Sequence, residues 1–160
     1  MREPEIRGVE ADGMRTPEPG LNGLPPVDLA TLDLLPDPAW VTGARPGFAY
    51  FNTAWLAMTG SAERSISSEE FLELVHPDDR AQLHQRFEDA YAATASFAAQ
   101  YRIRRAGGEH HWFLMRAAPV ERDGALSGWL ATVIDIDAER RARDELVASE
   151  ARARSIANVI

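Results

Sequence analysis

Two turn dipeptides, Gly107-Gly108 and Asp123-Gly124, constrain the fold more than any other feature of the sequence. Each supplies residues that adopt positive φ at low steric cost, and each lies between runs rich in aromatic and β-branched residues. This pattern predicts a three-stranded antiparallel meander over residues 97–106, 109–121 and 125–136. The last strand ends in Asp135-Ile136-Asp137 and continues into a charged helical segment. We therefore expect a sheet whose final strand passes directly into an outgoing helix.

The residues before the meander predict a hairpin followed by several short helices. Short strands are expected at 39–42 and 48–51, because an Ala-Arg-Pro-Gly turn separates them. Asn52 suits the N-cap of the next helix, and Gly60 its left-handed C-cap. A capping box at 67–70 and a proline after His76 begin two further helices. The order of elements predicts an α+β domain with a five-stranded antiparallel sheet and helices on one face.

The two ends of the chain read differently from this central part. Residues 1–26 hold five of the ten prolines and predict a disordered leader or linker. Residues 27–36 predict a short amphipathic helix, which needs a surface to pack on because it is too short to be stable alone. Residues 138–160 predict a helix with a heptad seam, and a lone surface helix is the alternative to a coiled-coil dimer. The seam positions are Ala142, Leu146, Ser149, Ala153, Ile156 and Ile160.

Composition excludes several classes of function. The net charge of −8 argues against binding to nucleic acid or to an anionic membrane surface. No run approaches the roughly 20 apolar residues of a membrane span, and no signal peptide is recognised. We therefore expect a cytoplasmic protein or a cytoplasmic piece of a larger one. The absence of cysteine excludes thiol catalysis and a cysteinyl–flavin adduct of the LOV type.

Five motifs follow one another along the chain: Y-F-N-T-A-W…T-G at 50–60, H-P-D-D-R at 76–80, the meander residues from Tyr101 to Trp129, D-I-D at 135–137 and E-R-R at 139–141. In this order and at this spacing they resemble the PAS sensory fold of bacterial multidomain sensors. The segment S-E-A-R at 149–152 is similar to the lead-in to another PAS module. The third residue of D-I-D is aspartate where the family has threonine, and aspartate can also cap a helix. The resemblance covers roughly residues 32–152.

The resemblance implies a domain organisation and a role. It implies a PAS domain over residues 37–137, an N-terminal cap helix before it and a signalling helix after it. Asp135, Ile136 and Asp137 would relay the signal to an effector domain or a further PAS module. The effector would be a histidine kinase of a two-component system or a cyclic-dinucleotide enzyme, and no catalytic segment of either type is recognised in the chain. This segment is therefore not expected to be an enzyme.

Strand alternation predicts which residues face the helices and could line a ligand pocket for a small molecule. The alternative is that the same residues close-pack and leave no cavity. The predicted lining residues are Met58, Phe87, Tyr91, Tyr101, Ile103, Phe113, Met115, Leu130, Thr132 and Ile134.

The opposite face of the sheet is also apolar, which predicts that something covers it. The cap helix and a second subunit of a homodimer are the expected partners, and the cap helix alone is the alternative. The residues of this dimer or cap-helix face are Leu29, Leu32, Trp112, Leu114, Trp129, Ala131 and Val133.

Metal, haem and catalytic chemistry find little support in the sequence. His84 lies at the edge of a helical apolar stripe, where a solvated histidine explains it better than haem ligation. His110 and His111 are neighbours on a strand and point to opposite faces, so they cannot chelate one metal together. Asp78 and Asp79 suit the positive end of a helix dipole and need no acid–base role. A cofactor-binding redox or gas sensor and a ligand-free interaction scaffold remain the alternatives to a sensory relay.

Overall fold

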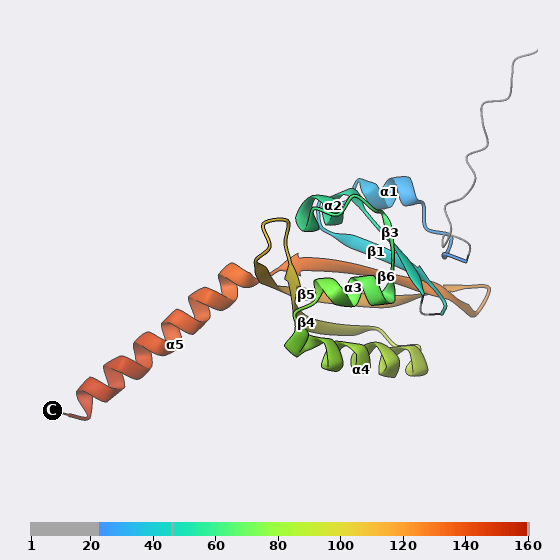
Figure 1. The fold of residues 1–160 in the computed structure, drawn as a ribbon. Coiled ribbons are helices and arrows are strands. Elements are labelled where there is room, and N and C mark those ends of the chain that lie inside the picture. The colour runs from blue at the N-terminus through green and yellow to red at the C-terminus, as the bar shows by residue number, and fades with distance from the viewer. Residues whose placement is uncertain (1–22, 46, 160) are drawn as a thin grey trace, which may run out of the picture.

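A computed structural model describes residues 23–45 and 47–159, and Figure 1 shows its arrangement. Residues 1–22 of the predicted leader, and Ile160 of the predicted seam, lie outside the described residues. The elements, in chain order, are α1 (Leu29–Asp33), β1 (Ala39–Gly43), β2 (Phe48–Phe51), α2 (Thr53–Thr59), β3 (Ser65–Ser67), α3 (Ser68–Leu74), α4 (Pro77–Ala93), β4 (Phe97–Arg104), β5 (His110–Arg122), β6 (Ala125–Asp135) and α5 (Asp137–Ala157). The predicted α+β class and antiparallel sheet are confirmed.

The sheet has six strands in the order β3-β2-β1-β6-β5-β4, one more than predicted. The additional strand, β3, is three residues long and pairs with β2 at the sheet edge. A segment this short carries no readable alternation, so only its pairing with β2 identifies it. β6 lies between β1 and β5, and therefore joins the N-terminal hairpin to the C-terminal meander.

A β-bulge in the β5–β6 hairpin sets which face each residue of β6 occupies. Arg122 pairs with Ala125 and Glu121 with Leu126, but Val120 pairs with Gly128, so Ser127 has no partner on β5. One extra residue moves every residue beyond it to the opposite face of the sheet. Trp129, Ala131 and Val133 consequently lie in the main core, not on the outer face as predicted. Leu130, Thr132 and Ile134 lie on the opposite face, away from the helices that were expected to enclose them.

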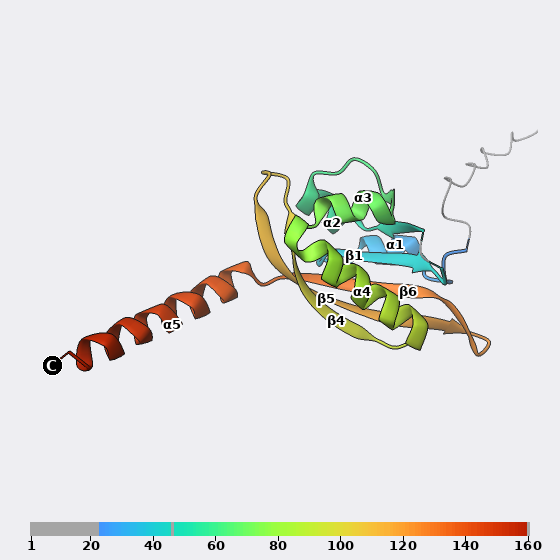
Figure 2. The same ribbon diagram turned by 60° about the horizontal axis from the view of Figure 1, so that its bottom comes forward.

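Two apolar layers sandwich the sheet. The main core lies between the inner face and the helices α2, α3 and α4, and Figure 2 shows α3 and α4 across that face. Trp55, Phe113 and Met115 are among its fully buried side chains. A smaller cluster on the outer face brings Leu32 of α1 against Ala39, Val41 and Tyr50. The cap helix therefore covers the β1–β2 part of the outer face.

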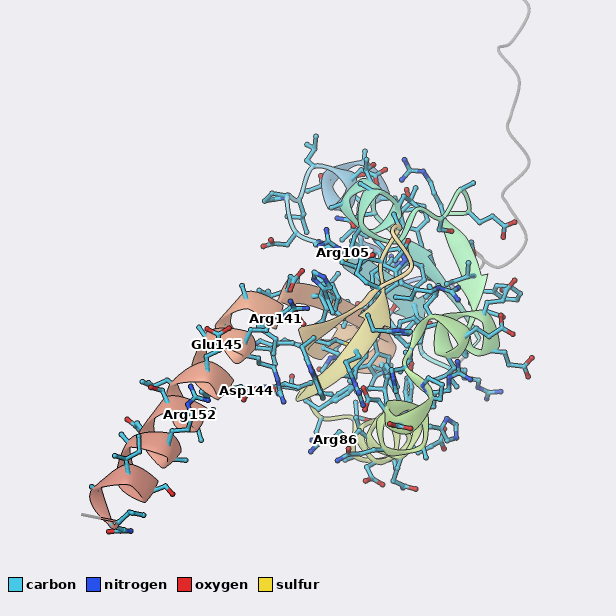
Figure 3. All side chains as sticks on the ribbon, turned by 60° about the vertical axis from the view of Figure 1, so that its left-hand side comes forward. Arg86, Arg105, Arg141, Asp144, Glu145 and Arg152 are labelled. Atoms are coloured by element: carbon cyan, nitrogen blue, oxygen red, sulfur yellow. The ribbon has the colours of Figure 1, made fainter. Side chains whose placement is uncertain are left out.

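Helix α5 extends away from the domain, as Figures 1 and 3 show. Asp137 is its only buried residue, and Leu146, Val147 and Ile156 are each at least 60% exposed. In the part of the chain that the structure describes, no helix has the length and apolar character needed to cross a membrane.

Candidate ligand cavity and helix junction

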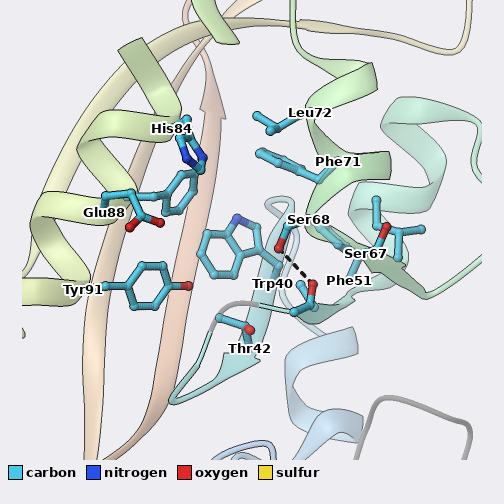
Figure 4. A pocket seen from close by; sticks show the side chains of 14 residues that line it. Trp40, Thr42, Phe51, Ser67, Ser68, Phe71, Leu72, His84, Glu88 and Tyr91 are labelled. Atoms are coloured by element: carbon cyan, nitrogen blue, oxygen red, sulfur yellow. Dashed lines mark hydrogen bonds between the residues drawn. The ribbon is translucent and has the colours of Figure 1, made fainter. Parts of the chain in front are cut away.

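A cavity of about 100 Å³ opens between α3, α4 and the strands β1 to β3. In Figure 4 the indole of Trp40 lies in the middle of the cavity, with α4 on one side and α3 on the other. The lining residues are Trp40, Thr42, Gly47, Ala49, Phe51, Ile66, Ser67, Ser68, Phe71, Leu72, His84, Phe87, Glu88 and Tyr91. It is smaller than the 300–1,000 Å³ typical of pockets for drug-sized ligands. The cavity suits a small group rather than a large cofactor.

Aromatic rings make up most of the inner wall. The rings of Trp40 and Phe87 lie 6.1 Å apart, those of Phe71 and Phe87 6.3 Å, and those of Phe51 and Phe71 6.2 Å. These separations fall in the range of favourable aromatic pairs. The wall is thus a connected aromatic cluster contributed by β1, β2, α3 and α4.

The ionisable side chains among the described lining residues belong to α4 and lie at the mouth of the cavity, where His84 and Glu88 are exposed. His84, Glu88 and Tyr91 follow one another at helical spacing on α4, so their side chains share the face of α4 that lines the opening. Burial, together with the nearby charge of Glu88, raises the pKa of the Tyr91 hydroxyl to about 12. The hydroxyl is therefore neutral and available as a hydrogen-bonding group at physiological pH. None of the arginines in the described part of the chain lines the cavity.

The predicted lining residues divide into three groups. Phe87 and Tyr91 line the cavity, and Met58 packs half-buried against the main core. Tyr101, Ile103, Phe113 and Met115 are buried in that core, where the Tyr101 hydroxyl lies 3.3 Å from the Met115 sulfur. Leu130, Thr132 and Ile134 belong to the other face because of the bulge. The sequence interpretation missed Trp40, Phe71 and Glu88, although the spacing of Glu88 and Tyr91 on α4 could have indicated a shared face.

The histidines do not assemble a metal site among the described residues. The rings of His76 and His110 lie 5.0 Å apart, and burial followed by the charge of His76 lowers the pKa of His110. His111 instead lies 3.0 Å from Asp135, at the end of β6. Its partner therefore belongs to the segment that leads into α5.

Asp135 and Asp137 fix the start of α5 against the sheet. The Asp137 backbone N–H donates to the Asp135 carboxylate at 2.9 Å, and the Trp112 backbone N–H donates to the Asp137 carboxylate at 3.2 Å. Arg141, one turn later, contacts the same Asp137 carboxylate at 2.7 Å. Asp137 does not cap α5, contrary to the prediction from the sequence. Ile136 is the N-cap, and the Asp137 carboxylate instead accepts from the backbone of β5.

A stack of cations on Trp112 connects α4 to α5 across the outer face. Asp79, in the first turn of α4, holds the Arg102 guanidinium at 2.7 and 2.9 Å, and this arginine lowers the pKa of Asp79. The Arg102 guanidinium carbon lies 4.9 Å from the centre of the Trp112 ring, and that of Arg140 lies 3.8 Å from it. Arg140 also donates to Gln100 of β4 at 2.6 Å. Cation–π contacts of this kind contribute roughly 0.5–2 kcal/mol each.

Comparison with known proteins places these features in a family. The family described as "PAS fold" matches residues 48–133. An uncharacterised protein of Sinorhizobium fredii is 32% identical over 117 residues, which are 72% of this chain and 14% of that protein. A peroxide stress-activated histidine kinase of Schizosaccharomyces pombe is 28% identical over 131 residues, which are 76% of this chain and 8% of the kinase. The chain thus spans a small part of the curated relatives that it matches.

A solved structure has the same fold. It is a sensory box histidine kinase/response regulator from Burkholderia thailandensis, with a TM-score of 0.61 and 18% identity. The match covers 79% of this chain and 95% of the solved one.

Proposed function

The chain belongs to the PAS-fold family, and from this premise we propose that it is a cytoplasmic sensory and dimerisation module whose helix α5 relays a signal to an effector domain. The proposed effector is a histidine kinase, because a relative and a structural neighbour are both named as such. A further PAS module is the other proposed recipient of the signal. The single observation that carries the relay is the junction at the first turn of α5, which β5 and β6 contact directly and α4 reaches through Arg102 and Trp112.

Two routes lead from the rest of the domain to that junction. Asp137 ties α5 to the backbone of β5, so a shift of the central strands alters the start of the helix. The stack of Asp79, Arg102, Trp112 and Arg140 ties the same turn to α4, which also lines the cavity. Beyond this turn no residue of α5 is buried by the part of the chain that the structure describes, so a change at its base can move the whole helix.

A large cofactor does not fit the proposed site. A cavity of about 100 Å³ is too small for a haem or a flavin, and His84 is at its mouth rather than in its interior. The proposed relay therefore involves only this chain's own residues and a small ligand.

The relay through α4 is tested by releasing Arg102 from α4. We expect Asp79→Asn to speed amide hydrogen exchange several-fold more in residues 137–141 than in β2. The reason is that Arg102 loses the carboxylate that holds it against Trp112, the ring that Arg140 of α5 also contacts. Asp78→Asn is the matched control, since the Asp78 carboxylate is exposed and lies 3.9 Å from Arg102. Equal exchange at 137–141 in both variants would contradict the proposed route.

A further inference from the structure

The cavity between α3 and α4 combines aromatic walls with a single acidic group, and this combination specifies a class of ligand. The inference rests on the proposed sensory function and names the chemistry of its input. We propose that the cavity binds a small organic cation, with a quaternary or tertiary ammonium head among the rings and its tail directed toward the mouth.

The walls favour a cation over a neutral group of the same shape. Aromatic rings present a negative face, and a cation within about 6 Å of a ring centre is attracted to it. Trp40, Phe71 and Phe87 come from three different elements and meet at one cavity, so a single group can contact several rings together. Figure 4 shows Trp40 with Tyr91 to one side and Phe71 to the other.

The charges at the mouth point to the same ligand class. Among residues 23–45 and 47–159, Glu88 is the only carboxylate that lines the cavity, and no arginine lines it. An anionic ligand would therefore meet the Glu88 carboxylate, with His84 as the one lining side chain that can carry a positive charge, and this balance disfavours its burial. The Tyr91 hydroxyl has no side-chain or backbone hydrogen-bond partner among residues 23–45 and 47–159, so it is available to a polar tail.

The volume limits the size of the head group. An apolar cavity of about 150 Å³ is known to admit benzene, and the present cavity of about 100 Å³ is somewhat smaller. A head group no larger than trimethylammonium suits this space, whereas a nucleotide does not. A neutral molecule of identical shape is the strictest competitor.

The test compares choline with its uncharged isostere, 3,3-dimethylbutan-1-ol, by isothermal titration calorimetry on the 160-residue chain. We expect choline to bind about tenfold more tightly than the alcohol, because only the cation gains from the rings and from Glu88. The anion 3,3-dimethylbutanoate is expected not to bind. Equal or tighter binding of the alcohol, or no binding of choline, would overturn the cationic specificity.

Variants separate the cavity from general electrostatic attraction. Glu88→Gln, at an exposed position, is expected to weaken choline binding about threefold and to leave binding of the alcohol unchanged. Asp89→Asn is the matched control, because Asp89 is the next residue on α4 and does not line the cavity. Equal losses in the two variants would assign the attraction to the net charge of −8 and overturn the role of Glu88.

A second variant addresses the rings. Phe87→Leu keeps an apolar side chain, so the ratio of choline affinity to alcohol affinity is the relevant measure, with circular dichroism to check the fold. We expect this ratio to fall toward one, and an unchanged ratio would overturn the aromatic contribution. The proposed relay does not depend on these outcomes, because the hydrogen-exchange experiment on Asp79→Asn uses no ligand.

Discussion

Asn52 joins four segments of the chain through one fully buried amide. Its side-chain oxygen accepts from the backbone N–H groups of Ala39 and Trp55, at 2.9 and 3.1 Å. Its side-chain nitrogen donates to the carbonyls of Leu32 and Asp37, at 3.1 and 3.0 Å. One residue thus fastens the end of α1, the connection to β1, β1 itself and the start of α2.

We predict that Asn52→Ala lowers the free energy of unfolding by about 3 kcal/mol or more. The substitution removes a helix cap and leaves buried backbone groups without partners, each of which costs about 1–3 kcal/mol. Urea denaturation measures the change. Ser67→Ala is the control, because Ser67 caps α3 at an exposed site and its loss is expected to cost about 1 kcal/mol. Similar losses for the two variants would show that Asn52 acts only as a cap.

At the residue scale, the sequence predicts local roles better than distant ones. The N-cap at Asn52, the C-cap at Gly60 and the capping box at Ser67 follow from residue type and spacing, and all are present. The bonds from Asn52 to Leu32 and Asp37 span 20 and 15 residues, so no local pattern contains them. The contact of Asp137 with Trp112 spans 25 residues and was missed for the same reason.

Ser127 is the extra residue of β6, and its role can be tested at the scale of an element. Its deletion would let the pair of Val120 and Gly128 follow the pair of Glu121 and Leu126 directly, which leaves Val133 opposite Met115 on the inner face. We predict that this deletion lowers the unfolding free energy by less than about 2 kcal/mol, because no core side chain loses its burial. Urea denaturation, with the near-UV circular dichroism signal retained, measures this outcome.

The matched control for the deletion is Ser127→Ala. It keeps the number of residues in β6 and removes only a hydroxyl, so it is expected to unfold within about 0.5 kcal/mol of the parent. A deletion variant that loses the near-UV signal, while this control keeps it, would contradict the expected regular pairing of β5 with β6.

The bulge also explains where prediction from the sequence stops for whole elements. The turn dipeptides locate β4, β5 and β6 because they report local backbone geometry. They do not report which face of the sheet each residue of β6 occupies. One extra residue exchanges the two faces, while polar and apolar residues still alternate along β6. Trp40 and Phe71 of the cavity wall were missed for a related reason: the wall depends on how closely they approach Phe87 across three elements.

At the scale of the whole molecule, the domain leaves two apolar regions without cover from the described residues. The cap helix α1 packs on β1 and β2, whereas Ile134 of β6 is 41% exposed on the same face. Helix α5 exposes Leu146 and Ile156 along the predicted heptad seam. Only Asp137 of this 21-residue helix is buried among the described residues, so packing on the domain stabilises little of α5. A second copy of the chain, paired along α5, would bury the seam and stabilise both helices.

Leu146 and Val147 provide a matched test of this dimer, since they are adjacent and each is 60% exposed. Leu146 lies on the predicted seam, next to Ala142, Ser149 and Ala153, whereas Val147 lies beside it. We predict that Leu146→Glu yields a monomer at concentrations where the parent chain and Val147→Glu are dimers, because the charge is placed in the helix interface only in the first variant. Sedimentation velocity measures the molar mass of all three. A parent chain that sediments as a monomer, or equal behaviour of the two variants, would contradict pairing along this seam.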